Sequence, residues 1–368
     1  MRRIAIAVAA PTLTLSLAAC GAFGGSGSSA KASPTKGNDV TVGLLLPDTA
    51  TSRYDKFDYP IIKSKIAELT SNQGKVDYAN AEGVADKQAT QMQKMIDDKV
   101  DVILLDAVDS HTIVGEVKKA KDAGIPVIAY DRLAEGPIDA YISFDNELVG
   151  EVQGRSLLEA IGEKASLADK IVMMNGSSTD PNAKQFKEGA LSQLNGKVTI
   201  AKSYDTADWK PVFAQTEMEN AISAVGKNNI AGVYSANDDM AVGIIKALKD
   251  AGVTHLPPIT GQDATLDAVH RILTGDQYMS VYKSYPQEAE NVAEMAIAKI
   301  QGKDIEFDSL TRDKVSSPTN QDVPAQLVPV VALTKTNIKD TVIDDGLYKL
   351  SDICTPKYSS ECAAAGLK

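Results

Sequence analysis

Short apolar runs alternate with segments of helical periodicity along most of the chain. Near-continuous apolar runs occupy residues 40–46, 102–105, 127–130 and 170–174. A segment with apolar positions at helical spacing follows the first, second and fourth of them. Apolar runs without strict alternation are typical of parallel strands that are covered on both faces. Strands that alternate with helices in this way predict an α/β fold with parallel sheets.

The same βα plan occurs twice. A predicted helix ends in Lys-Asp-Ala-Gly at residues 121–124 and again at residues 249–252, 128 residues further on. The repetition predicts two similar lobes. Three strands fall where one copy ends and another element begins, so we expect them to cross between the lobes and to form a hinge. These predicted crossovers are residues 140–144, 259–263 and 279–283.

Polar residues follow the predicted strands at their carboxyl ends, where open α/β sheets bind ligands. They are Arg53, Tyr54, Asp131, Arg132, Asp145, Asn182, Asn237, Asp263 and Lys283. Asp accepts hydrogen bonds, Arg donates them and Asn does both, which suits the hydroxyls of a neutral sugar. An anionic ligand would not account for the carboxylates in this set. A cationic ligand would not account for the two arginines. The alternative for an Asp or Asn in such a place is the N-cap of the next helix, and Asp131 with Arg132 could form an internal ion pair.

The single tryptophan, Trp209, stands in a polar segment, where it is available to stack on the C–H face of a sugar ring. The alternative is a structural anchor for its loop. Other chemistries find no support: a glycine-rich phosphate loop and a Gly-x-Ser-x-Gly motif are absent from the sequence, and its three histidines are widely spaced. We therefore expect no cofactor, no metal and no enzymatic activity. A sugar-modifying enzyme remains the alternative from another class.

The two ends of the chain carry signals of their own. Arg2 and Arg3 precede a short apolar run that ends in Leu-Ala-Ala-Cys-Gly, which predicts an export signal at residues 1–19 and a lipid-modified Cys20. Residues 20–38 are rich in Gly, Ser, Ala and Lys and predict a flexible tether. Near the other end, Cys354 and Cys362 predict a disulfide, with zinc as the weaker alternative. The formal charge of −11 becomes −13 once the two arginines are removed, which argues against nucleic acid as a partner.

Several longer strings show a resemblance to a known family. They span residues 128–132, 141–147, 182–184, 235–238, 261–264 and 279–283. The chain resembles the periplasmic sugar-binding proteins of ABC importers, and among them the D-xylose-binding branch. The resemblance implies two Rossmann-like lobes joined by three hinge strands (periplasmic binding protein type I), a monosaccharide in the cleft between them, and an ABC permease as the membrane partner.

By residue, the resemblance implies contacts with the ligand that largely coincide with the strand-end set. They are Arg53, Asp131, Arg132, Asn182, Trp209, Asn237, Asp263 and Lys283. Tyr54 stands where the branch tends to have Trp, which bears on the shape of the cleft. Xylose is therefore the first expectation, with glucose, another aldose or a furanose as alternatives.

The domain organisation follows from these expectations. We expect the N-terminal lobe at residues 39–144 plus 284–326, the C-terminal lobe at 145–283 plus 327–346, and a tail at 347–368. The protein is expected to be a monomer at the extracellular face of the cell membrane, attached to the membrane through its lipid anchor only.

Overall fold

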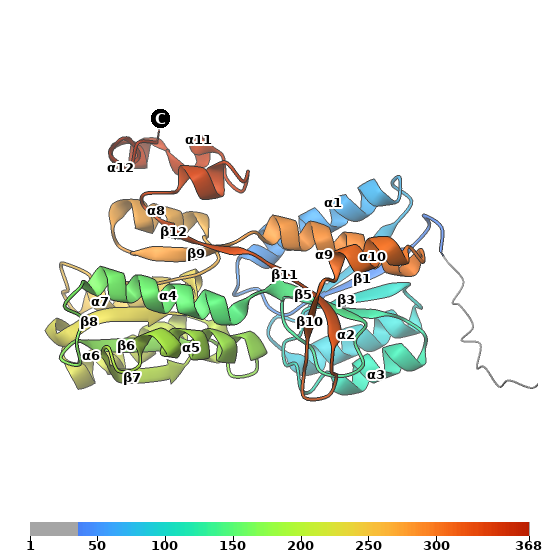
Figure 1. Cartoon of the computed structure of the whole chain (residues 1–368), viewed down its shortest axis with the longest axis horizontal. Coiled ribbons are helices and arrows are strands. Elements are labelled where there is room, and N and C mark those ends of the chain that lie inside the picture. The colour runs from blue at the N-terminus through green and yellow to red at the C-terminus, as the bar shows by residue number, and fades with distance from the viewer. Residues whose placement is uncertain (1–35, 368) are drawn as a thin grey trace, which may run out of the picture. The chain divides into compact units, whose positions relative to one another are not determined.

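The computed structural model describes residues 36–367. The predicted export signal, Cys20 and most of the predicted tether lie outside this range. Within the described residues, two lobes are each built on a sheet of mostly parallel strands with helices packed against it (Figure 1). This is the α/β architecture that the alternating pattern predicts.

The first lobe holds a seven-stranded sheet in the order β10-β11-β5-β4-β3-β1-β2. All strand pairs in it are parallel except β10 with β11. The strands are β1 (Thr41–Leu46), β2 (Lys75–Asn80), β3 (Val102–Leu105), β4 (Val127–Tyr130), β5 (Ala140–Phe144), β10 (Asp313–Val315) and β11 (Val323–Val328). The helices of this lobe are α1 (Tyr59–Leu69), α2 (Ala85–Asp97), α3 (Val114–Asp122), α9 (Tyr285–Ile300) and α10 (Asp304–Leu310). Every residue of β3 and β4 is buried, as expected for strands covered on both faces.

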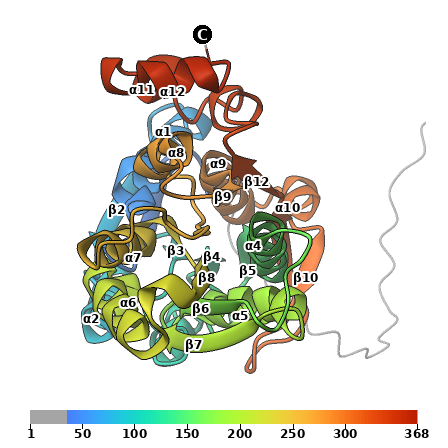
Figure 2. The same cartoon turned by 90° about the vertical axis from the view of Figure 1, so that its left-hand side faces the viewer.

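The second lobe holds the parallel strands β7-β6-β8 and, beside them, the antiparallel pair β9-β12. Bridges from Ile259 to Val233 and from Gln262 to Val281 connect the two groups. The strands are β6 (Lys170–Asn175), β7 (Thr199–Asp205), β8 (Ile230–Ser235), β9 (Met279–Lys283) and β12 (Val330–Thr334). The helices are α4 (Asn146–Ile161), α5 (Pro181–Leu194), α6 (Pro211–Val225), α7 (Asp238–Asp250) and α8 (Leu266–Thr274), which Figure 2 shows around this sheet.

The chain passes between the two sheets at three places. These are the steps from β5 to α4, from β9 to α9 and from β11 to β12. Two of them agree with the predicted crossovers at residues 140–144 and 279–283. The prediction for residues 259–263 is wrong, because Ile259 and Gln262 both pair inside the sheet of the second lobe. The third crossover lies instead near Pro329, between β11 and β12.

Two glycines set the spacing of the most closely packed helices, α4 and α5. A Cβ atom at Gly150 would lie 2.0 Å from the carbonyl oxygen of Phe186, and one at Gly189 would lie 2.0 Å from that of Glu147. Only glycine allows the two backbones to approach this closely. The approach fixes the middle of α5 on α4, and the first turn of the same helix carries Asn182.

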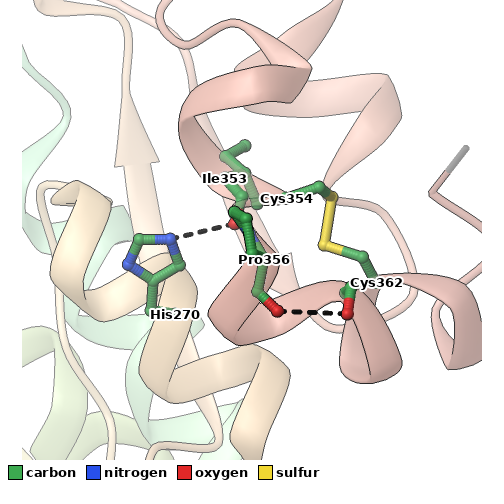
Figure 3. Close-up of a disulfide and its surroundings, with 6 residues drawn as sticks. His270, Ile353, Cys354, Pro356 and Cys362 are labelled. Carbon is green, nitrogen blue, oxygen red and sulfur yellow. Dashed lines mark hydrogen bonds between the residues drawn. A yellow bond between two sulfur atoms is a disulfide. The ribbon is translucent and has the colours of Figure 1, made fainter.

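The C-terminal segment ends in two short helices, α11 (Leu350–Ile353) and α12 (Ser359–Ala364), which contact α8. Cys354 and Cys362 form a disulfide between them, and Nε2–H of His270 on α8 donates to the carbonyl oxygen of Ile353 at 3.0 Å (Figure 3). The aromatic ring of Tyr348 extends this packing to Phe57 in the first lobe, with ring centroids 5.9 Å apart. The tail is therefore anchored on the second lobe and also contacts the first.

Candidate functional site

Residues from both lobes line one small, largely buried cavity, in which the centre of a water-sized sphere has only about 20 Å³ of space. The lining residues are Thr51, Arg53, Tyr54, Asp131, Arg132, Asp180, Asn182, Phe186, Trp209, Asn237, Gln262, Asp263 and Lys283. Nine of the ten ligand-binding residues predicted from the sequence are among them, so segments up to 230 residues apart in the chain meet at this cavity.

Arg53 is held by two buried carboxylates of the first lobe. It immediately precedes a π-helical turn, η1 (Tyr54–Asp58), and its Nε and Nη2 each donate to Asp58 at 2.9 Å. Nη2 also donates to Glu288 on α9. Because these bonds fix the guanidinium from one side, its position does not depend on a ligand. Nη1 alone has no hydrogen-bond partner among the described residues.

Asp131 lies at the end of β4 with φ of 56°, in the left-handed region that is uncommon for a residue other than glycine. Its Oδ2 accepts a hydrogen bond from the Tyr54 hydroxyl at 2.9 Å. Its backbone carbonyl accepts one from Nδ2 of Asn182, in the other lobe, also at 2.9 Å. Oδ1 lies 3.9 Å from Nη1 of Arg53, too far for a direct hydrogen bond. A donor and an acceptor therefore face the same small gap.

The charges around Arg53 and Asp131 fix how each group takes part in hydrogen bonds. Burial alone would lower the pKa of Arg53, but Asp58 and Glu288 raise it well above its ordinary value. Burial would raise the pKa of Asp131, yet the positive charges of Arg53 and Lys283 outweigh burial and lower it. Asp131 is therefore ionised at neutral pH and can only accept hydrogen bonds.

Arg132 joins carboxylates of both lobes. Nη2 donates to Asp48 at 3.2 Å and Nη1 to the carbonyl oxygen of Ala107 at 3.1 Å, both in the first lobe. Nε lies 3.0 Å from Oδ2 of Asp180, in the second lobe, and 3.5 Å from Asp106. The predicted alternative of an internal Asp131–Arg132 ion pair is not what forms; Arg132 pairs with other carboxylates.

Trp209 is held in place on the side of the second lobe. It ends a 3-10 turn, η2 (Ala207–Trp209), in which Asp208 and Trp209 have φ of 53° and 56°. The indole Nε1 donates to Oδ2 of Asp180 at 3.2 Å. The ring lies so close to Gly176 that a Cβ atom there would be 2.0 Å from its Cη2. The side chain is nearly buried, so it is a rigid part of the cavity wall rather than an exposed loop residue.

The remaining residues of the second lobe complete this wall. Oδ1 of Asn237 accepts from the backbone N–H of Met240 at 2.9 Å and so caps α7, and Asn237 lines the cavity as well. Nζ of Lys283 lies 2.9 Å from Oδ1 of Asp263 and 5.1 Å from the ring centroid of Phe144. Burial alone would lower the pKa of Lys283, but the charge of Asp263 raises it. Lys283 is therefore cationic and paired.

Asp145 is a correction to the predicted set. It does not line the cavity, and its side chain is exposed. Its Oδ1 accepts from the backbone N–H of Leu148 at 3.0 Å, which makes it the N-cap of α4. The cap interpretation, open from the sequence, is the right one here because the crossover from β5 turns the residue away from the cleft.

Four lining residues were not predicted: Thr51, Asp180, Phe186 and Gln262. Asp180 precedes Pro181 at the start of α5, and in the sequence it resembles an ordinary helix N-cap. In the structure it is that N-cap and lines the cavity as well. Gln262 directly precedes Asp263, and the same strand-end position indicates a place in the cleft for both residues. Phe186 stands on the apolar face of α5, and nothing local distinguishes it from a core residue.

The lining is balanced in charge and incomplete in hydrogen bonds. It contains the cations Arg53, Arg132 and Lys283 and the carboxylates Asp131, Asp180 and Asp263. Some buried polar atoms of the lining have no hydrogen-bond partner within residues 36–367: Arg53 Nη1, Asp131 Oδ1, Asn182 Oδ1, Gln262 Oε1, Asp263 Oδ1 and Arg132 Nε, the last two of which lie in ion pairs. Buried polar atoms are nearly always satisfied in folded proteins, so this set suits a polar ligand.

Two other expectations concern metals and membranes. Across the part of the chain that the structure describes, no cluster of three or more His, Cys, Asp or Glu side chains is arranged to hold a metal ion. Within the same residues, no helix combines the length and the apolar character needed to span a membrane.

The fold and the cavity define a two-lobed binding protein with its site between the lobes, and comparison with known proteins gives the family. The periplasmic binding protein domain matches residues 42–304. The D-xylose-binding periplasmic protein of Escherichia coli is 35% identical over 321 residues, which cover 86% of this chain and 93% of that protein. The chain therefore belongs to the periplasmic binding protein family.

Two further relatives extend the comparison. The multiple sugar-binding periplasmic protein of Azospirillum brasilense is 32% identical over 335 residues, covering 86% of this chain and 92% of that protein. A solved ABC transporter solute-binding protein from Clostridium phytofermentans, with bound β-D-glucose, aligns with a TM-score of 0.76 and 26% identity. The alignment covers 85% of this chain and 99% of the C. phytofermentans chain. Proteins of this family bind solutes and are not enzymes.

Proposed function

We propose that the protein captures a neutral monosaccharide in the cavity between its lobes and delivers it to an ABC permease, with D-xylose as the first candidate. The observation that carries this proposal is the set of unpaired buried atoms in the lining. Among residues 36–367, Asp131 Oδ1, Asn182 Oδ1 and Gln262 Oε1 are acceptors without a hydrogen-bond partner, and Arg53 Nη1 is a donor without one. The hydroxyls of a sugar, each of which donates and accepts, match such a set.

One hydroxyl can satisfy two of these atoms at once. Arg53 Nη1 and Asp131 Oδ1 lie 3.9 Å apart, and a hydroxyl oxygen near both would accept from the guanidinium and donate to the carboxylate. Both bonds involve a charged group and are therefore stronger than bonds between neutral groups. Trp209 supplies the apolar surface on which the C–H face of the ring would stack.

The first choice of sugar rests on the relatives. The E. coli protein at 35% identity is described as binding D-xylose. Glucose is the second candidate because the similar structure from C. phytofermentans holds β-D-glucose. Another aldose or a furanose would have to place its hydroxyls on the same acceptors.

The cellular setting belongs to the same proposal. Residues 1–19 would be removed as an export signal, Cys20 would carry the lipid, and residues 20–38 would tether a monomeric receptor outside the membrane. The lobes would comprise residues 39–144 plus 284–328 and 145–283 plus 329–346, followed by a tail at 347–368; the end of β11 moves the predicted boundary from 326 to 328. The predicted ligand contacts at Arg53, Tyr54 and the other lining residues are part of this proposal too.

A titration of the mature protein with a panel of aldopentoses, aldohexoses and polyols tests the proposal. A ligand at about one hundred times its dissociation constant stabilises the folded protein by about 2.7 kcal/mol, which raises the melting temperature by a few degrees. We expect the largest shift with D-xylose, full recovery of the unchanged sugar, and no shift in an Asp263→Ala variant. The proposal fails if neither an aldopentose nor an aldohexose raises the melting temperature.

A further inference from the structure

One carboxylate oxygen of the cavity accepts a hydrogen bond from its own lobe and forms an ion pair with the opposite lobe. Oδ2 of Asp180 accepts from Nε1 of Trp209 at 3.2 Å and lies 3.0 Å from Nε of Arg132. Trp209 belongs to the second lobe, as Asp180 does, whereas Arg132 follows β4 in the first lobe. The same oxygen therefore holds the aromatic wall of the cavity and contacts the opposite lobe.

The carboxylate is itself fixed in place. Its other oxygen, Oδ1, accepts from the backbone N–H of Asn182 at 2.8 Å and caps the start of α5. Asp180 is 5% exposed, so water does not compete freely for these bonds. Because α5 is packed closely on α4, Asp180 cannot follow Arg132 or Trp209 if either moves. Asp180 is therefore a fixed point within the second lobe, against which Arg132 of the first lobe docks when the lobes close.

Trp209 depends on this bond for its orientation. The ring lies against Gly176 on one side, and its backbone is in the left-handed region. The hydrogen bond from Nε1 to Asp180 sets the remaining rotation of the indole about its side-chain bonds. Arg132, in contrast, has Asp48 and the carbonyl oxygen of Ala107 as partners in its own lobe. It loses only its contact with Asp180 when the lobes separate.

We infer that Asp180 is a positioning residue that couples lobe closure to the stacking wall: it orients Trp209 and, in the closed protein, latches Arg132 of the opposite lobe. The inference rests on the proposed function, because the latch matters only if a ligand is enclosed. Release of the ligand requires the Arg132–Asp180 contact to break, whereas association does not. Asp180 thereby sets how long the sugar remains bound, without being required to contact it.

The chain offers a direct probe, because Trp209 is its only tryptophan. We would compare Asp180→Asn, which keeps one oxygen but no charge, with Asp180→Ala, which removes both oxygens. The matched control is Asp208→Asn. This variant removes one negative charge at the residue next to Trp209. The Asp208 side chain is exposed, pairs with Lys210 and does not contact Arg132. Stopped-flow fluorescence with D-xylose gives the association and release rates of each variant.

We expect the release rate of Asp180→Asn to rise about ten- to hundredfold, with a much smaller change in the association rate. Asp180→Ala should release at least as fast and should also lower the fluorescence anisotropy of Trp209 without ligand, because the indole is no longer held. Asp208→Asn should resemble the wild type in both measurements. If the role of Asp180 were purely structural, its replacement would lower the melting temperature. The release rate and the association rate would then change by similar factors.

A release rate of Asp180→Asn within about twofold of the wild type would overturn the latch. An unchanged anisotropy in Asp180→Ala would overturn its role in orienting Trp209. If the wild type binds no monosaccharide at all, the proposed function fails and the latch for a sugar fails with it. The ligand-free anisotropy then still decides whether Asp180 holds the ring, so the two failures are distinguishable.

Discussion

Replacing Gly176 by alanine is expected to weaken sugar binding while the rest of the fold is kept. Gly176 follows β6, and the added Cβ would lie 2.0 Å from Cη2 and 2.1 Å from Cζ2 of Trp209. Non-bonded carbon atoms pack at about 3.5–4.0 Å, so the indole has to move by about 1.5 Å. It cannot do so and keep both its bond to Asp180 and its place in the cavity wall.

The magnitude follows from the cost of this displacement. Overpacking by one methyl group in a tight site costs about 1–3 kcal/mol. The ligand-free protein can relax by turning the ring into the cavity, but the bound protein cannot, so most of this cost opposes binding. At about 1.4 kcal/mol for each factor of ten, the dissociation constant of the sugar should rise about five- to hundredfold.

Isothermal titration calorimetry with D-xylose measures the affinity, and Trp209 emission reports the movement of the ring in the same samples. Gly115→Ala is the matched control, because a Cβ at Gly115 on α3 has no heavy atom within 4 Å among the described residues. If Gly176→Ala binds the sugar as tightly as the wild type with unchanged emission, the indole does not form the wall of the occupied site, and the stacking argument is wrong.

Three further outcomes are expected. Arg53→Met leaves the carboxylates around Arg53 buried without their partner and should lower the free energy of unfolding by about 3–5 kcal/mol, measured with urea. Burial raises the pKa of Asp239, which accepts from the backbone N–H of Ser52 across the cleft, to about 6. Because closure then takes up a proton that the open form releases, affinity should rise up to about tenfold as the pH falls from about 7 to 5, and Asp239→Asn should remove this dependence. Opening the disulfide by replacing Cys354 and Cys362 with serine should destabilise the tail by about 2.5 kcal/mol, measured by hydrogen exchange, while sugar affinity is kept.

Each of these outcomes can be contradicted by its own measurement. Unchanged unfolding of Arg53→Met would mean that its carboxylate partners become protonated at little cost. The sign of the pH effect follows from the raised pKa of Asp239: the favourable contribution to closure is present below about pH 6 and is lost above it. Affinity that rises with pH in the wild type would contradict that sign. A loss of affinity in the serine variant would show that the tail takes part in closure.

The sequence was sufficient to find most of the site because strand ends are local features. A buried run such as β3 or β4 is visible as continuous apolar residues, and the polar residue that follows it must lie at the edge of the sheet. Asp131 and Asp263 were found in this way although their neighbours in space are far away in the chain. Asp145 also follows a strand, yet its side chain caps α4 and does not line the cavity. A polar residue after a strand can therefore be either a helix cap or a ligand contact, and the local sequence does not distinguish the two.

The features that sequence reasoning missed depend on long-range pairing. Glu288 lies in the first turn of α9, where an acidic residue ordinarily stabilises the helix and faces water. Here it is fully buried against Arg53, 235 residues away in the chain. The wrong crossover at residues 259–263 has the same cause, since a strand inside a lobe and a strand between lobes share one local pattern and differ only in their partners.

The buried carboxylates explain why the site favours a neutral ligand although it contains three cationic side chains. Arg53 is already paired with Asp58 and Glu288, Arg132 with Asp48 and Asp180, and Lys283 with Asp263. No positive charge is therefore left over to compensate an anion, and the ionised Asp131 faces the same cavity. A sugar acid or sugar phosphate would bury a negative charge beside existing ones, which is costly in a site that excludes water. A neutral sugar meets the same guanidinium and carboxylates as rigid hydrogen-bonding groups whose positions are already fixed, so little binding energy is spent on ordering them.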